Sequence, residues 1–155
     1  MIRGLAIASV LFLAVNMASA QTKAPTKKPV RHGDWFAKVL IDKMTDAKEC
    51  LVLNAKDPYV SVDPVGRLDI NYRGRGGVAG YQYRIDSNPA SPYQLLPPGR
   101  TDVLSVSDVR DEFNSARRLL IQGETVLGRP ISLEYDMRGF DKARADATKL
   151  CEGAA

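Results

Sequence analysis

The 155-residue sequence predicts one β-rich α+β domain, an antiparallel sandwich or half-barrel of six to eight short strands with a middle helix and a C-terminal helix. Three observations support this fold class. Short runs of alternating apolar and polar residues recur between Gly, Pro and Asp breaks. Apolar residues with helical spacing occur once in the middle of the chain and once at its end. Two cysteines are placed to link the final helix to an early strand.

The first 20 residues have the features of a secretory signal peptide in the usual order. Arg3 supplies a positive charge, residues 5–15 are apolar, and Ala18-Ser19-Ala20 matches the small-x-small cleavage pattern. A buried N-terminal helix is the alternative. The apolar run is too short to span a bilayer, and no later stretch predicts a transmembrane segment. We therefore expect cleavage before Gln21 and a periplasmic or secreted protein.

Residues 21–33 are basic, contain two prolines and lack acidic residues, which predicts a solvated linker. Five of the 22 Lys and Arg residues lie at or before position 33, which leaves 17 against 18 acidic residues in the predicted domain, 34–155. Because the domain is near neutral, its charge gives no support for nucleic-acid binding. The linker has the charge to contact anionic surfaces such as lipid head groups. We expect a monomer.

The predicted strands follow one another along the domain and are separated by turn residues. They cover residues 34–42, 50–54, 59–62, 68–72, 81–85, 93–96, 103–106 and 131–135. A glycine-rich run at 74–77 separates the fourth strand from the fifth, and we interpret these two strands as a hairpin around that turn.

The middle helix is predicted to begin after Asp108, a suitable N-cap residue. Its apolar face would hold Val109, Phe113, Ala116 and Leu120. Arg117 and Arg118 are expected on its solvated face. The run at 119–121 is alternatively the start of a strand, so the end of this helix stays open.

The C-terminal helix is predicted from one apolar stripe. The stripe holds Phe140, Ala143, Ala147, Leu150 and Cys151. In an oxidising compartment, a disulfide between Cys50 and Cys151 is the simplest interpretation of two cysteines. Free thiols, one reactive thiol and an intermolecular bridge are the alternatives.

Catalytic chemistry has little support in the sequence. The only histidine, His32, lies in the predicted linker, where it could not hold a fixed position beside a nucleophile. The two cysteines are assigned to the bridge, so we expect no metal site and no cofactor. The carboxylates are too numerous to single out a glycosidase pair. We expect a protein that is not an enzyme, with a carboxylate-based hydrolase as a remote alternative.

The candidate binding site is a patch of Tyr72, Arg73, Arg75, Tyr81 and Tyr83 around the glycine-rich turn. Guanidinium groups beside exposed backbone amides suit an anionic ligand, and Tyr and Arg are enriched at protein interfaces. The competing interpretation is that the tyrosines face the core or pair across the sheet, and that the glycines only form the turn.

The chain resembles the invasion-associated locus B family of small exported bacterial proteins at both ends of the predicted domain. The matching pieces are Gly33-Asp34-Trp35, with a cysteine-bearing strand soon after it, and Ile131-Ser132-Leu133-Glu134-Tyr135-Asp136-Met137-Arg138-Gly139-Phe140-Asp141-Lys142-Ala143. The resemblance implies a β-rich periplasmic or surface protein associated with host interaction, without catalytic residues to carry over.

We therefore hypothesise an exported, non-enzymatic envelope binding protein whose Tyr/Arg-rich hairpin contacts a protein or an anionic glycan or lipid head group. The alternative is a periplasmic or secreted inhibitor of a lysozyme-type or protease-type hydrolase, because small disulfide-bonded β domains present rigid loops.

Overall fold

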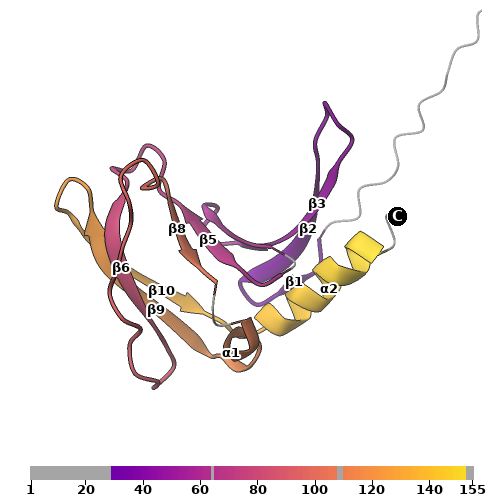
Figure 1. The fold of residues 1–155 in the computed structure, drawn as a ribbon. Coiled ribbons are helices and arrows are strands. Elements are labelled where there is room, and N and C mark those ends of the chain that lie inside the picture. The colour runs from indigo at the N-terminus through magenta and orange to yellow at the C-terminus, as the bar shows by residue number, and fades with distance from the viewer. Residues whose placement is uncertain (1–28, 64, 108–109, 153–155) are drawn as a thin grey trace, which may run out of the picture.

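The computed structural model describes residues 29–63, 65–107 and 110–152, so the predicted signal peptide and most of the linker lie outside it. Ten strands and two helices are present in this part of the chain (Figure 1). They are β1 (Arg31–His32), β2 (Trp35–Ile41), β3 (Lys48–Asn54), β4 (Val60–Val62), β5 (Leu68–Asn71), β6 (Val78–Ile85), β7 (Gln94–Leu95), β8 (Val103–Val106), α1 (Arg110–Ser115), β9 (Arg118–Thr125), β10 (Pro130–Asp136) and α2 (Phe140–Glu152). The predicted fold class is confirmed. β1 was not predicted, and β9 contains the run at 119–121 that was left open between helix and strand.

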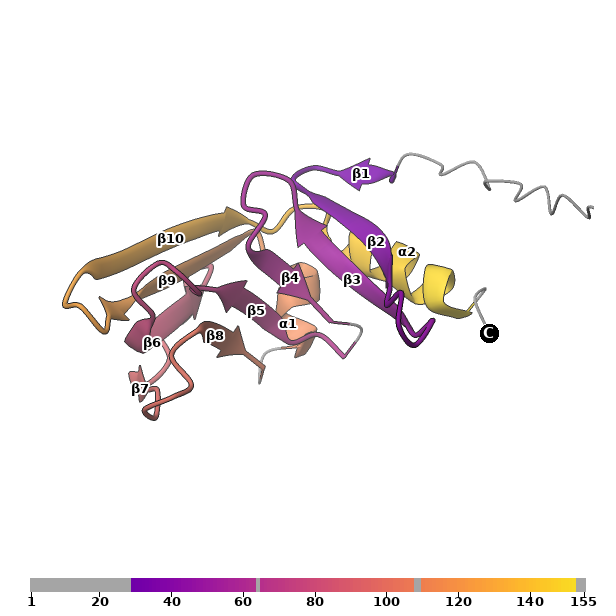
Figure 2. The ribbon, with the colours of Figure 1, turned by 90° about the horizontal axis from the view of Figure 1, so that it is seen from above.

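The strands form two antiparallel sheets. Six of them follow the order β1-β2-β3-β4-β5-β8, and the other four follow the order β10-β9-β6-β7. Figure 2 shows the two sheets from above, with α2 lying along β2 and β3. One hydrophobic core contains buried residues from both sheets and both helices.

Aromatic side chains fill the core where α2 meets the sheets. Trp35 is completely buried, and its ring centroid lies 5.2 Å from that of Phe140, which in turn lies 6.0 Å from Phe113. The indole Nε1 of Trp35 donates to the backbone oxygen of Asp136 at 2.7 Å, which joins the start of β2 to the end of β10. Burying each of these rings stabilises the fold by about 1.5–3 kcal/mol.

The C-terminal helix lies where the sequence predicts it. Phe140, Ala143 and Ala147 are its buried residues, whereas Leu150, which was also predicted to be buried, is 45 % exposed. The predicted disulfide between Cys50 and Cys151 is present and joins residues 101 positions apart. A covalent bond therefore holds the final turn of α2 against β3. Packing of Leu150 against the sheet is not needed to hold the turn there.

The middle helix is shorter than its apolar face predicts. It ends at Ser115, Arg118 begins β9, and Asp108 and Val109 lie outside the described residues. Leu119 and Ile121 are fully buried in that strand, so the alternative of a strand at 119–121 is the correct one. β9 pairs with β6 on one side and β10 on the other. Pairing with both neighbours outweighs the helical spacing of the apolar residues in this segment.

The predicted hairpin around residues 74–77 is wrong, because its two strands belong to different sheets. β5 pairs with β4 and β8, while β6 pairs with β7 and β9. The backbone N–H of Tyr72 donates to Asp102 at 2.6 Å, and that of Val78 donates to Thr101 at 2.7 Å. The flanks of the turn are thus bonded to the segment before β8 and not to each other.

The folded part of the chain begins earlier than residue 34. Arg31 and His32 pair with Phe36 and Trp35 in the β1–β2 ladder, so the end of the predicted linker belongs to the sheet. Neither of the described helices has the length and apolar character needed to cross a membrane.

Candidate binding groove

The five residues of the predicted patch do not form one surface. Tyr72 is 6 % exposed and Tyr81 only 2 %, and Tyr83 packs against the core. Only Arg73 and Arg75 are exposed to solvent. The interpretation that the tyrosines face the core is therefore the one that the structure favours.

Arg75 is held in place by its neighbours. Its guanidinium carbon lies 4.3 Å from the ring centroid of Tyr59 and 4.6 Å from that of Tyr72. Its Nη2 donates to the backbone oxygen of Asn71 at 3.1 Å. Because the cation stacks on two aromatic rings, Arg75 fastens the β3–β4 connection to the β5–β6 turn, and Arg73 is the member of the patch that extends into solvent.

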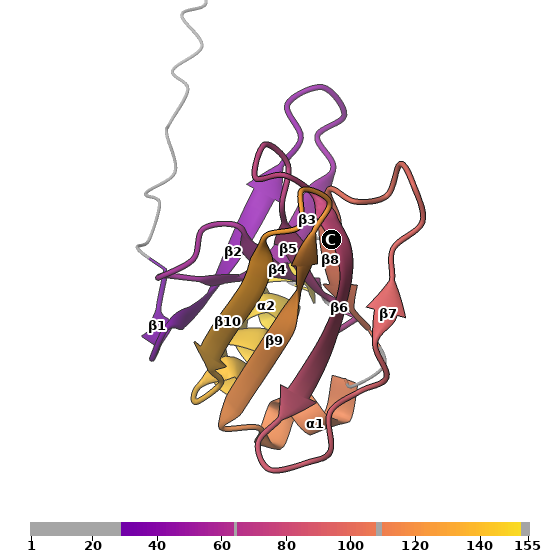
Figure 3. The ribbon, with the colours of Figure 1, turned by 90° about the vertical axis from the view of Figure 1, so that its left-hand side faces the viewer.

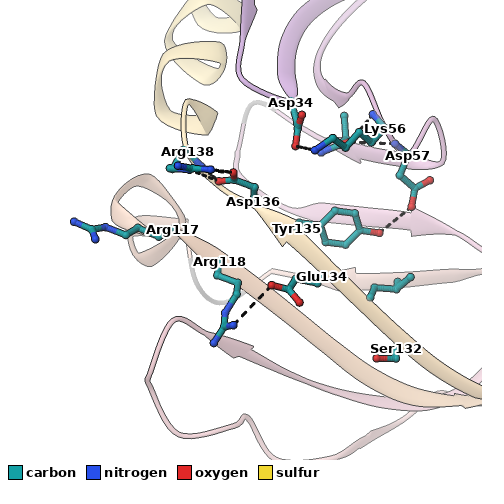
Figure 4. A pocket seen from close by; sticks show the side chains of 12 residues that line it. Asp34, Lys56, Asp57, Arg117, Arg118, Ser132, Glu134, Tyr135, Asp136 and Arg138 are labelled. Carbon is teal, nitrogen blue, oxygen red and sulfur yellow. Dashed lines mark hydrogen bonds and ion pairs between the residues drawn. The ribbon is translucent and has the colours of Figure 1, made fainter.

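A larger feature lies where the edge of the four-stranded sheet meets the β3–β4 connection. It is a groove of about 940 Å³, which we call the seam groove (Figure 4). It is lined by Asp34, Asn54, Lys56, Asp57, Arg117, Arg118, Ser132, Leu133, Glu134, Tyr135, Asp136 and Arg138. Four of these residues are acidic and four are basic, so the groove is charged but close to neutral overall.

Ion pairs connect most of the charged side chains in the seam groove. Lys56 Nζ lies 2.7 Å from Asp34 Oδ2, and Arg118 Nη1 lies 3.7 Å from Glu134 Oε1. The second pair is loose, since 48 % of the Arg118 side chain and 61 % of the Glu134 side chain are exposed. In Figure 4, Arg117 points away from the other labelled side chains. Loose surface pairs contribute little to stability, so these charges are available to a partner.

A charged contact made of several hydrogen bonds joins Arg138 to Asp136 in the groove. The guanidinium Nε donates to the two carboxylate oxygens at 2.9 and 3.0 Å. These hydrogen bonds from Arg138 hold the pKa of Asp136 at about 2, so its carboxylate stays ionised in mildly acidic solution. The pair gives one end of the groove a fixed arrangement of charge.

Tyr135 crosses from β10 to the β3–β4 connection. Its hydroxyl donates to Asp57 Oδ2 at 2.9 Å, and the residue is only 6 % exposed. Burial, followed by this hydrogen bond to a carboxylate, raises the pKa of Tyr135 far above its ordinary value. The phenol therefore remains neutral and acts as a hydrogen-bond donor that fixes the width of the groove at this point.

His32, the only histidine, lies outside the seam groove. Its Nε2 is 2.8 Å from Asp146 Oδ2, which links β1 to α2. It borders a smaller cavity of about 530 Å³ that shares Asp34, Lys56, Asp136 and Arg138 with the seam groove. The prediction that His32 lies in a mobile linker is therefore wrong, because pairing of β1 with β2 holds it against the C-terminal helix.

The arrangement is suited to recognition of a charged, extended ligand. Both cysteines are joined in the disulfide, and the described residues contain no cluster of three His, Cys, Asp or Glu side chains placed to hold a metal ion. The groove offers exposed ionic groups of both signs beside the edge of a sheet. Such a surface provides charge complementarity and orientation for a polar partner.

Sequence reasoning missed the seam groove because its walls come from separate segments. Asp34 begins the first predicted strand, Lys56 and Asp57 are turn residues, and Ser132 and Glu134 are the polar positions of an alternating strand. Alternation places those two side chains away from the core, but it does not say that β10 is an edge strand. That information comes only from the order of the strands.

Comparison with known proteins gives a match in fold. No family model matches the sequence, and no curated protein matches it significantly. The structure is similar to the crystal structure of invasion associated protein B from Bartonella henselae, with a TM-score of 0.53 and 13 % sequence identity. The similarity covers 82 % of this chain and 99 % of that chain. The resemblance inferred from the two ends of the domain is therefore confirmed for the fold.

Proposed function

We propose that this chain is an exported, non-enzymatic binding protein of the bacterial envelope that holds a partner protein in the seam groove. The observation that carries the proposal is a groove of about 940 Å³ lined by equal numbers of acidic and basic residues. Its size is near the upper end of the range for small-molecule pockets, and its mixed charge suits a polypeptide better than a purely anionic ligand.

Export is supported by two independent features. The first 20 residues have the pattern of a signal peptide, and the Cys50–Cys151 disulfide fits a location outside the cytoplasm. The fold is similar to that of a protein described as invasion associated, which is consistent with a role in contact with a host. The proposed site replaces the Tyr/Arg-rich patch, because the tyrosines of that patch are largely buried.

The test is affinity capture with the mature protein, residues 21–155, from envelope and host-cell extracts. The groove variant is Lys56→Ala with Arg118→Ala, which removes two exposed cations that line the groove. The matched control is Lys38→Ala with Arg84→Ala, which removes one exposed lysine and one exposed arginine elsewhere on the sheets.

We expect a partner that the wild type and the control retain and that the groove variant loses. A partner retained equally by all three proteins would place the binding site elsewhere. Arg73→Ala is then the next variant, because Arg73 remains exposed at the glycine-rich turn. Turnover of a glycan substrate that one Asp or Glu substitution abolishes would contradict the non-enzymatic part of the proposal.

A second candidate function is inhibition of a hydrolase by the loop at residues 86–92. The carboxylate of Asp86 accepts from the backbone N–H groups of Arg117 and Arg118 at 3.0 and 2.8 Å, and Ser91 Oγ accepts from the N–H of Tyr83 at 2.9 Å. These bonds fix both ends of an exposed loop, which lowers the entropic cost of inserting it into an active site. A panel of lysozymes and proteases with unchanged activity in the presence of the protein would exclude this candidate.

A further inference from the structure

β10 is the longest edge strand in the described part of the two sheets. It has seven residues, whereas the other three edge strands, β1, β7 and β8, have two, two and four. In Figure 3, where the four-stranded sheet faces the viewer, β10 forms one side of it. An edge strand of this length presents backbone groups that can pair with another chain.

The register shows which backbone groups of β10 point outward. Thr125 N donates to Arg129 O at 2.8 Å, and Met137 N donates to Arg117 O at 2.9 Å, at the two ends of the β9–β10 ladder. Hydrogen-bonded pairs alternate with non-bonded pairs in an antiparallel ladder. The bonded residues of β10 are therefore the odd-numbered ones, and Ser132 and Glu134 turn their N–H and C=O groups away from β9.

The residues on either side limit the free part of this edge. Asp136 also directs its backbone oxygen outward, and this oxygen accepts from the Trp35 indole at 2.7 Å. Pro130 has the same outward orientation and no N–H group, as expected for a proline on a sheet edge. In the described part of the chain, no residue outside the sheet ladder bonds to the backbone of Ser132 or Glu134.

We propose that β10 takes up an extended segment of a partner protein as an additional strand, bonded to the backbone of Ser132 and Glu134. This rests on the proposed function, since it specifies how the seam groove holds its partner. Both residues line that groove. Strand addition obtains affinity from backbone hydrogen bonds and specificity from alternate side chains.

The side chains of β10 define the chemistry of the partner segment. Residues 130–136 contain the acids Glu134 and Asp136 and no base, so a partner strand with Lys or Arg opposite Glu134 is complementary. Leu133 is partly buried and points to the core side, which favours an apolar residue at the neighbouring position of the partner. Edge-to-edge pairing of two copies would bring only acids together, which disfavours the chain itself as the occupant.

The first experiment measures amide hydrogen exchange of the free mature protein by NMR. The amides of Leu133 and Tyr135, which bond to β9, are expected to exchange slowly, and those of Ser132 and Glu134 quickly. Slow exchange at Ser132 and Glu134 that depends on protein concentration would show pairing of two copies and would overturn the proposal. Slow exchange that is independent of concentration would also overturn it, because the edge would already be covered.

The second experiment pans a phage library of random seven-residue peptides against the mature wild-type protein, with the Glu134→Pro variant for counter-selection. The proline removes one outward N–H and leaves the β9 ladder intact, while Glu134→Gln is the control that keeps the N–H and loses the charge. Selected peptides are then synthesised with and without N-methyl groups at alternate amides. Binding of the methylated peptides to the wild type still tests the proposal if the Pro variant does not fold.

We expect N-methylation at the amides facing β10 to weaken binding at least about tenfold, because it removes backbone bonds and leaves carbonyls unpaired. Bound peptide should also slow exchange at Ser132 and Glu134. Failure to enrich any peptide on the wild type over Glu134→Pro, or equal binding of methylated peptides, would overturn strand addition. A partner lost by the Lys56/Arg118 variant and kept by Glu134→Pro would refute strand addition alone and leave the proposed function standing.

Discussion

Replacing both cysteines by alanine removes the only covalent link between β3 and α2 that the structure shows. The Cys50–Cys151 bridge closes a loop of 101 residues. The chain-entropy relation for a loop of this length gives about 4.7 kcal/mol of stabilisation, mostly through restriction of the unfolded chain. Since domains of this size are stable by about 5–15 kcal/mol, the double variant should lose a large part of its free energy of unfolding.

The assay is urea unfolding followed by tryptophan fluorescence. Trp35 is the single tryptophan and is completely buried beside α2, so its emission reports loss of the core. With an m-value of about 2 kcal/mol/M, the midpoint of the double variant should fall by about 2 M. The m-value should rise, because the unlinked denatured chain is less compact.

The control is Leu150→Ala, which changes the neighbouring and 45 % exposed residue of α2 and should alter stability by about 0.5 kcal/mol or less. A loss below about 1 kcal/mol in the double cysteine variant would refute the reasoning, because loop closure of this length cannot then be the main effect of the bridge.

Three further predictions concern the core and its surroundings. Tyr135 should stay protonated in alkaline solution, because burial raises its pKa. The stability that this gives is complete below pH about 10, the pKa of tyrosine in an unfolded chain, and is lost as pH rises above it. A phenolate absorbance titration with parallel unfolding measurements will check this. Gly139→Ala should cost roughly 1–3 kcal/mol, because Gly139 has φ +87° and a Cβ there would overlap the backbone oxygen of His32. Gly74→Ala, with φ +77° and no atom within 4 Å, should cost less in the same urea assay. Phe140→Ala should cost about 3–5 kcal/mol, because its ring is fully buried between two other aromatic rings, and a midpoint within error of the wild type would contradict this.

The parts of the fold that the sequence predicts well are those with a strong local pattern. Alternation from Trp35 onward predicts β2, and the Phe140–Ala143–Ala147 stripe predicts α2. In a chain predicted to be exported, two cysteines predict one bridge, because the sequence offers each of them no other cysteine.

The errors occur where pairing is non-local. The residues from Phe113 to Leu120 fit a helical period, but Leu119 and Ile121 also fit a strand, and the neighbouring strands β6 and β10 decide between them. The turn at 74–77 looks like a hairpin because strand patterns flank it. Whether two such strands pair with each other depends on residues 101–106, which bond to both flanks from far along the chain.

The candidate site could not be predicted from local sequence patterns for the same reason. A cluster of Tyr and Arg in sequence predicts a binding patch only if the side chains face solvent, and the pairing of β6 with β9 turns Tyr81 into the core. The seam groove needs the order of the strands to be known, because Glu134 and Lys56 line it from segments that are far apart in the sequence.

The position of the disulfide also determines how the molecule would respond to tension. A force applied to the two ends of the folded chain enters through β1 and β2, reaches Cys50 in β3 and crosses the bridge directly to Cys151 in α2. All residues between the two cysteines lie outside this path, so strands β4 to β10, and every residue of the seam groove except Asp34, carry no load through the backbone. Extension is limited to the residues before Cys50, about 70 Å of chain from position 29 onward. A protein held between two surfaces would therefore lengthen at its N-terminal strands, while strands β4 to β10 stayed free of backbone tension.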